Sequence, residues 1–240
     1  MSVRLVVSTI AIGVACSTLV GAGFQGSQAT QKPKPTVAIP NPGVPQIMTL
    51  EDRFVRVSYN NEGYVTMGYR LANGLQGKEW IMLEVGMALR DGVQAFKLPR
   101  TSVSLSTPDG GKLPLPTQTE FSQVDLRGLD QQAKVINDAI NYFPPNVRGT
   151  CRIGFFSEIG SGTSSFNEVE LSDNRGCVGR LYFKIPGGLK LGQHYLNVQF
   201  KNSLVRVPFR ILTKEEEQFL NKNWKDIRKQ VEEAFKKGGK

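Results

Sequence analysis

Residues 55–71 read VRVSYNNEGYVTMGYRL. Apolar side chains alternate with polar ones from Val55 to Tyr59, and the alternation resumes after the turn residues 60–63, from Val65 to Leu71. Period two on both sides of a glycine-containing loop is typical of a β-hairpin. We therefore predict that the chain is built mainly from antiparallel strands.

Similar short segments, separated by Gly, Pro, Asn and Asp, follow along the chain. The longest, Trp80–Leu89, is nearly all apolar and is expected to be buried on both faces. A parallel α/β fold would need a helix after most strands, and such helices are missing from the pattern. We predict a mostly β, two-sheet sandwich whose further strands cover 103–105, 113–115, 152–156, Glu168–Leu171, 178–185, 195–200 and Leu204–Ile211.

One segment between the strands has helical spacing. Apolar residues recur at steps of four, three, four and three, and two prolines at 144 and 145 end the run. This spacing predicts one inserted helix with its apolar face formed by Leu129, Ala133, Ile136, Ile140 and Phe143.

The sequence LKLGQHYLNV at 189–198 resembles the turn and penultimate strand of the immunoglobulin-like and fibronectin-type sandwich superfamily. The resemblance covers residues 178–211 and implies an immunoglobulin-like fold without implying an activity. Such domains usually carry a corner tyrosine two residues after the glycine. Here that place holds His194, so either histidine replaces the tyrosine or a bulge brings Tyr195 into position.

The last segment, 213–240, is predicted to be a long amphipathic helix. Thr213 and Glu216 form a capping box, and Lys236 and Lys237 complement the dipole at the other end. Either the apolar stripe packs on the protein's own sandwich as core, or it docks in a partner's groove or pairs with its copy in a homodimer. The candidate partner-binding face consists of Phe219, Leu220, Trp224, Ile227, Val231 and Phe235.

The first 29 residues have the layout of a secretory signal peptide. Arg4 precedes an apolar stretch, and small residues at 27 and 29 suit a signal peptidase. Two alternatives remain open, namely a lipoprotein signal with lipidation of Cys16 and an uncleaved membrane anchor. A Pro-rich linker at 30–47 follows, with five prolines. Each alternative places the remaining chain outside the cytoplasm.

Two cysteines, Cys151 and Cys177, remain if Cys16 belongs to the signal. An even pair in an oxidising compartment favours a disulfide over two free buried thiols. Closing a loop of about 27 residues would stabilise the fold by about 3–4 kcal/mol in the chain-entropy model.

The net charge is +9, with 30 basic and 21 acidic residues. The basic residues are spread along the chain, which favours acidic partners in general, such as anionic lipid headgroups or anionic polysaccharide, and does not indicate nucleic acid. Solubility alone also accounts for such a charge.

Few residues suit catalysis. His194 is the only histidine, and we expect a structural role for it. Glu168 and Glu170 share a strand face and are candidates for a glycosidase-type pair, although solvated carboxylates have the same spacing. The glycine- and serine-rich run 160–165 lacks the lysine of a phosphate-binding loop and is interpreted as an exposed, mobile connection. We predict no catalytic residues, no metal site and no cofactor.

Together these features predict an exported, non-enzymatic binding or scaffold protein of a bacterial envelope. It would be periplasmic or extracellular, with Cys16 as a candidate lipoprotein tether, and would engage a protein or glycan partner. The alternative is a carboxylate-dependent hydrolase of envelope polymers.

Overall fold

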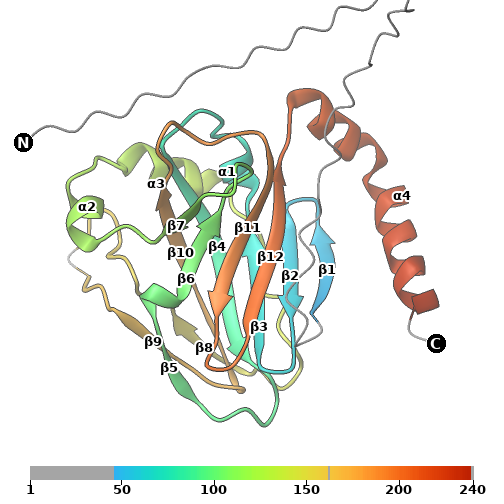
Figure 1. The fold of residues 1–240 in the computed structure, drawn as a ribbon, viewed down its shortest axis with the longest axis horizontal. Coiled ribbons are helices and arrows are strands. Elements are labelled where there is room, and N and C mark those ends of the chain that lie inside the picture. The colour runs from blue at the N-terminus through green and yellow to red at the C-terminus, as the bar shows by residue number, and fades with distance from the viewer. Residues whose placement is uncertain (1–45, 162, 239–240) are drawn as a thin grey trace, which may run out of the picture. The chain divides into compact units, whose positions relative to one another are not determined.

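The predicted hairpin lies in the middle of the larger of two sheets (Figure 1). The computed structural model describes residues 46–161 and 163–238, without the side chains of 232 and 234–238. Strands β2 (Val55–Tyr59) and β3 (Gly63–Gly68) pair antiparallel, which confirms the hairpin. Its turn is held by the Asn60 side chain, whose Oδ1 accepts hydrogen bonds from the backbone N–H groups of Glu62 and Gly63.

The described strands form two main sheets and one separate pair. The first sheet has the order β1-β2-β3-β4-β10-β8, the second has the order β12-β11-β6-β7, and β5 pairs with β9. Pairing is antiparallel except between β10 and β8. The remaining strands are β1 (Ile47–Asp52), β4 (Trp80–Leu89), β5 (Phe96–Pro99), β6 (Val103–Ser106), β7 (Lys112–Pro114), β8 (Gly149–Arg152), β9 (Glu168–Leu171), β10 (Arg175–Lys184), β11 (Gly192–Gln199) and β12 (Leu204–Ile211).

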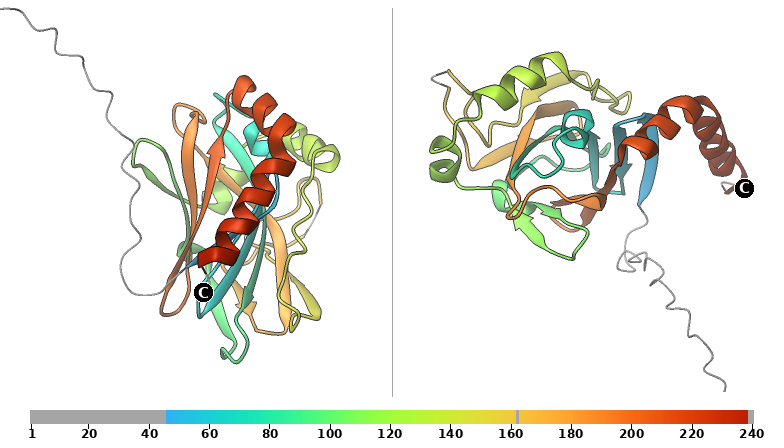
Figure 2. Two further views of the ribbon diagram at one scale, coloured as in Figure 1. Left: turned by 90° about the vertical axis from the view of Figure 1, so that its right-hand side faces the viewer. Right: turned by 90° about the horizontal axis from the view of Figure 1, so that it is seen from above.

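The two sheets pack face to face, and one continuous core cluster takes residues from both (Figure 2). Strand β4 is almost entirely buried, as its apolar run predicts. The helical elements lie between strands or at the end of the chain. They are α1 (Arg70–Asn73), the 3-10 turn η1 (Arg100–Ser102), α2 (Gln118–Ser122), α3 (Arg127–Val135) and α4 (Lys214–Gly238).

The inserted helix is shorter than predicted. Helix α3 ends at Val135, and Ile140 and Phe143 lie in an irregular segment that crosses the outer face of the first sheet. Asp138 draws this segment onto the sheet, because its carboxylate accepts two hydrogen bonds from Arg70 and its backbone N–H donates to Glu84. These tertiary hydrogen bonds replace the last turns of the helix.

Phe143 occupies space left by glycines of the sheet. A Cβ atom at Gly86 would lie 2.6 Å from its ring, and one at Gly176 would lie 2.7 Å from it. Phe143, whose spacing predicted a helix, therefore packs over the sheet from an irregular segment.

Two predicted strands differ from the structure. The second hairpin strand stops at Gly68 instead of Leu71, because the N–H of Arg70 bonds Asp138 and the chain turns into α1. The strand predicted at 152–156 is wrong, since β8 covers Gly149–Arg152 and shares only Arg152 with it. Phe155 and Phe156 turn into the core rather than continuing the ladder.

The first described residue, Gln46, connects the edges of the two sheets. Its backbone leads directly into β1, while its side-chain amide donates to the carbonyl of Arg206 and accepts from the N–H of Arg206 at 2.8 Å. Arg206 lies on β12, the edge strand of the second sheet. The amide group therefore satisfies backbone groups that an edge strand leaves open.

Strand β11 has no bulge at His194 or Tyr195. Strand β11 pairs continuously with β12, and His194 is fully buried two residues after Gly192. Its Nδ1 lies 3.0 Å from the carbonyl oxygen of Gly192, and its ring stacks on Phe209. Tyr195 is half-buried, with the Arg206 guanidinium over its ring.

Helix α4 begins with the predicted capping box. The N–H of Glu216 donates to Thr213 Oγ1, and the N–H of Thr213 donates to the Glu216 carboxylate. Both figures place α4 alongside the β1 edge of the first sheet. Among the residues described, no helix has the length and apolar character to cross a membrane.

The buried His194 predicts a pH-dependent stability. Burial lowers its pKa, outweighing the opposing effects of Gly192 and Asp109, so the unfolded chain takes up a proton near pH 6.5 before the folded protein does. The free energy of unfolding should therefore fall as the pH decreases below about 6.5. His194→Phe keeps an aromatic ring on Phe209 and removes this titration, so the free energy of unfolding of the variant should fall less at low pH. Urea unfolding of the wild type and the variant at about pH 7.5 and about pH 5.5 measures the two decreases, and equal decreases would contradict the prediction.

Candidate functional site

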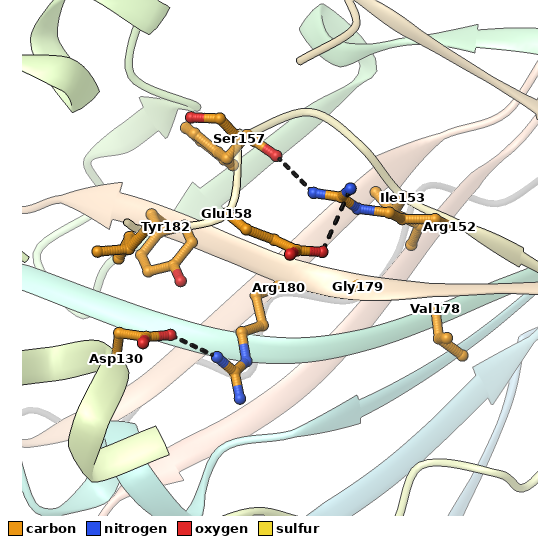
Figure 3. Close-up of a pocket in the computed structure, with 11 residues that line it drawn as sticks. Asp130, Arg152, Ile153, Ser157, Glu158, Val178, Gly179, Arg180 and Tyr182 are labelled. Atoms are coloured by element: carbon orange, nitrogen blue, oxygen red, sulfur yellow. Dashed lines mark hydrogen bonds and ion pairs between the residues drawn. The ribbon is translucent and has the colours of Figure 1, made fainter. Parts of the chain in front are cut away.

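A polar pocket lies beside strand β10 (Figure 3). Its volume is about 280 Å³, and its walls come from β10, the segment 152–159 and Asp130 of α3. Val178, Arg180 and Tyr182 alternate along β10, so the strand presents them on one face. The parallel pairing of β8 with β10 sets Arg152 directly beside Val178.

The first charged pair in the pocket is firmly held. Arg180 Nη1 lies 2.8 Å from Asp130 Oδ1, and its other terminal nitrogen donates to the carbonyl oxygen of Ala133. Asp130 also binds Lys134 one helical turn later, at 2.8 Å. Only 12% of the Asp130 side chain is exposed. This pair therefore fixes the end of α3 against the sheet as well as lining the pocket.

The second charged pair is looser. Arg152 Nη1 lies 3.3 Å from Glu158 Oε1, and its second contact is the carbonyl oxygen of Phe156 at 3.4 Å. The two side chains are 41% and 60% exposed. Exposed pairs of this kind contribute only about 0–1 kcal/mol. Figure 3 shows both charged pairs across the same opening.

Aromatic rings form the rigid part of the wall. Phe156 and Tyr182 line the pocket, and Phe121 of α2 packs on both, with ring centroids 4.7 and 4.9 Å away. Burial raises the pKa of Tyr182, so its hydroxyl stays protonated and can donate a hydrogen bond at neutral pH. The pocket thus combines acceptors, donors and an apolar surface.

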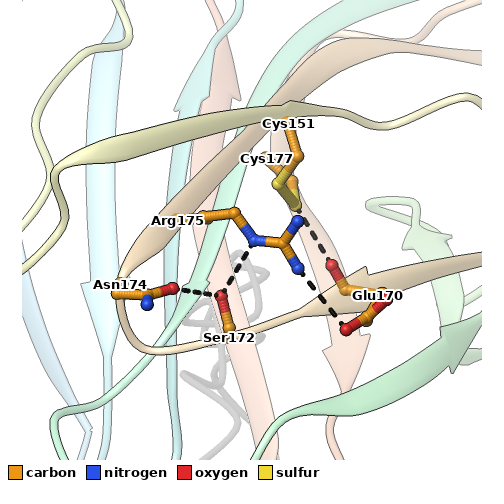
Figure 4. The surroundings of a disulfide bond; sticks show 6 residues. All are labelled: Cys151, Glu170, Ser172, Asn174, Arg175 and Cys177. Atoms are coloured by element: carbon orange, nitrogen blue, oxygen red, sulfur yellow. Dashed lines mark hydrogen bonds and ion pairs between the residues drawn. A yellow bond between two sulfur atoms is a disulfide. The ribbon is translucent and has the colours of Figure 1, made fainter.

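A disulfide joins the two strands that form the pocket (Figure 4). Cys151 and Cys177 stand directly opposite each other in the β8–β10 register, and they are bonded, as the even pair predicts. Each cysteine immediately precedes a lining residue, Arg152 or Val178. The disulfide therefore fixes the separation of the two walls at their base.

The acidic pair predicted from sequence lies elsewhere. Glu168 and Glu170 share the exposed face of β9, and each has a basic partner, Lys97 and Arg175 respectively. The pocket lining does not include them. His194 is buried and is not among the residues that line this pocket. Cys16, the predicted signal peptide 1–29 and the predicted linker up to residue 45 lie outside the described residues.

The run 160–165, in which residues 160, 161 and 164 are exposed, continues from one wall of the pocket. Ser157, Glu158 and Ile159 line it, and the run follows directly. Thr163 Oγ1 accepts a hydrogen bond from the N–H of Glu158, which joins the two segments. Residue 162 lies outside the described residues. The predicted loop therefore borders the pocket on the side of Glu158.

The predicted helix face forms a second surface. Phe219 is 64% exposed, and Leu220, Trp224, Ile227 and Val231 are half-buried. The Phe235 side chain lies outside the description. Within the described residues, the buried core takes none from α4.

Polar contacts join the start of α4 to the sheets. Glu217 accepts from Asn73, Glu216 binds Arg210, and Asn221 accepts from Arg53. An apolar groove of about 520 Å³ lies where the helix begins. Its lining is Arg56, Tyr69, Arg210, Leu212, Glu215, Glu216, Phe219 and Leu220.

Sequence reasoning missed the residues of the pocket. Asp130, Arg152 and Arg180 belong to no motif, because their meeting depends on the pairing of distant strands. One signal was present, since Arg152 and Val178 each follow a half of the predicted disulfide. A bond between Cys151 and Cys177 also brings Arg152 close to Val178.

Comparisons with known proteins add no assignment. No protein-family model, no curated protein and no solved structure matches this chain. Across 46–161 and 163–238, no group of three His, Cys, Asp or Glu side chains is placed to hold a metal ion. The site is therefore interpreted from its own geometry.

Removing the disulfide should weaken the fold and the pocket together. We expect C151A/C177A to lower the free energy of unfolding by about 3–4 kcal/mol, because a loop of about 27 residues is released in the unfolded chain. Urea unfolding measures the loss, and the wild-type protein in reductant is the matched control. A loss below about 1 kcal/mol in both samples would contradict this role.

Truncating the stripe of α4 should cost little. Trp224→Ala is expected to lower stability by less than about 1 kcal/mol, because the side chain is only half-buried, whereas Leu196→Ala in the fully buried core should cost about 2–5 kcal/mol. Urea unfolding of both variants under the same conditions measures the two losses in free energy of unfolding. Equal losses would show that the stripe acts as core.

Proposed function

We propose that this chain is an exported binding protein of a bacterial envelope, which holds a polar group of a protein or glycan partner in the pocket beside β10. The observation that carries the proposal is the balanced lining. Two carboxylates accept hydrogen bonds, two guanidinium groups donate them, and the charges cancel in pairs. Hydroxyl groups, which both donate and accept, suit such a lining.

Export is supported by two independent features. The signal-like residues 1–29 and the Pro-rich 30–45 precede the folded part, and a disulfide joins Cys151 to Cys177. Disulfides persist mainly in oxidising compartments such as the periplasm and the cell exterior. A lipid on Cys16 would hold the protein at a membrane while the linker spaces the pocket away from it.

An immunoglobulin-like scaffold is part of the proposal. The pairing of β4 with β10 resembles the B–E pair of that fold, and the order β12-β11-β6 resembles G–F–C. The parallel pairing of β8 departs from it. This architecture supports many functions, so it favours a rigid carrier of a site rather than a particular reaction.

The hydrolase alternative has one supporting observation, since Asp130 and Glu158 share the pocket. A glycosidase needs one carboxyl group that carries a proton to the leaving group. Here each carboxylate already binds an arginine. The arrangement therefore favours binding over hydrolysis.

The helix face of α4 is proposed as a second contact surface. Phe219 is exposed beside an apolar groove, which suits a protein partner or pairing with a second copy. In this arrangement the pocket selects a polar group and the helix contributes apolar contact area. A scaffold role would use the helix alone.

Filling the pocket tests the proposal. Ser157→Trp places a large ring in the pocket, while Ser161→Trp places the same ring on the neighbouring exposed loop. On an array of bacterial envelope glycans and peptides, we expect Ser157→Trp to lose at least about tenfold in affinity and Ser161→Trp to match the wild type. Equal binding by both variants would remove the pocket from the function. Release of new reducing ends from a bound glycan would establish the hydrolase instead.

A further inference from the structure

The two arginines of the pocket differ in how easily a ligand could engage them. Arg180 is held by the well-buried Asp130 and by a backbone carbonyl. With the described residues, Arg152 makes two long contacts, at 3.3 and 3.4 Å, although a guanidinium carries five N–H donors. Its partner Glu158 is mostly exposed and borders the loop 160–165. Arg152 therefore has an exchangeable partner and unused donors.

We propose that Arg152 receives the carboxylate of an acidic sugar unit, which takes the position that the Glu158 carboxylate now occupies. The inference rests on the proposed function, because it names the ligand class of the same pocket. An incoming carboxylate can bind a guanidinium in a bidentate manner, which is stronger than the single contact at Glu158. Glu158 then acts as an internal substitute that keeps Arg152 in place when the pocket is empty.

The rest of the lining favours a sugar as the carrier of that carboxylate. The pocket holds the volume of about nine water molecules at ~30 Å³ each, which suits one ring. Ring hydroxyls can donate to Asp130 and accept from the Tyr182 hydroxyl, while the ring face packs on Phe156. The net charge of +9 also favours an anionic polymer over a neutral one.

The experiment compares three probes by calorimetric titration. Trigalacturonate carries the acid, its methyl ester keeps the rings and hydroxyls without the charge, and an acetylated dipeptide carries a carboxylate without a sugar. Glu158→Gln removes the competing carboxylate, and Arg152→Gln removes the guanidinium that donates to the ligand carboxylate. Glu170→Gln and Arg175→Gln are matched controls, because that pair lies 3.4 Å apart outside the pocket with the same exposed fractions of 60% and 41%.

We expect the wild type to prefer trigalacturonate over its ester. Glu158→Gln should bind the acid about two- to fivefold more tightly, since an exposed ion pair no longer competes, and Arg152→Gln should bind it at least about tenfold more weakly. The control variants should match the wild type. Circular dichroism and thermal unfolding establish that all four variants are folded.

Other results would overturn the inference in distinguishable ways. Equal binding of the acid and the ester, with no effect of Glu158→Gln, would retain a glycan-binding pocket and exclude the role of Arg152. Preference for the dipeptide would make the partner a peptide. Failure of every probe to bind the wild type and Glu158→Gln would exclude the acidic sugar. If the Ser157→Trp variant then retained its partners on the array, the proposed pocket function would fail as well.

Discussion

The covalent bond between Cys151 and Cys177 is the constraint on which the rest of the site depends. Strand β8 is a short edge strand, and it is the only member of its sheet, within the described residues, that pairs parallel to its neighbour. Four residues of parallel ladder hold an edge weakly. The bond fixes the register of β8 on β10, and with it the position of the segment that carries Arg152 and Glu158. Rigid walls reduce the ordering that a ligand must impose when it binds.

Packing on the outer face of the first sheet places the remaining wall of the pocket. The segment that follows α3 is held by Asp138 and by Phe143 over Gly86 and Gly176. Since α3 is thereby anchored beside β10, Asp130 reaches Arg180 across the strand. The packing of α3 and the following segment on the sheet therefore also determines the position of Asp130 in the pocket.

Local patterns in the sequence identified elements that are specified by near neighbours. The hairpin at 55–68, the strands Trp80–Leu89 and Leu204–Ile211, and the capping box of Thr213 are examples. Their signals are period-two alternation, a continuous apolar run and a side chain three residues from its partner. The disulfide could also be anticipated, because only two cysteines were left to pair.

Features that depend on contacts between residues far apart in the sequence could not be predicted from local patterns. The spacing from Leu129 to Phe143 predicts one helix, and α3 ends at Val135 because Asp138 meets Arg70, 68 positions earlier. Arg152 and Arg180 come together through strand pairing alone. The burial of His194 rather than Tyr195 also depends on the register of β11, which the alternation of apolar residues leaves open.

The side chain of Gln46 gives the molecule a mechanical property. A pull on the preceding chain reaches β1 at its first residue, where the amide is also bonded to β12 in the opposite layer. Tension on that segment therefore reaches both layers at the point of entry. A protein anchored through that segment would therefore transmit an external pull to both sheets at once rather than to β1 alone.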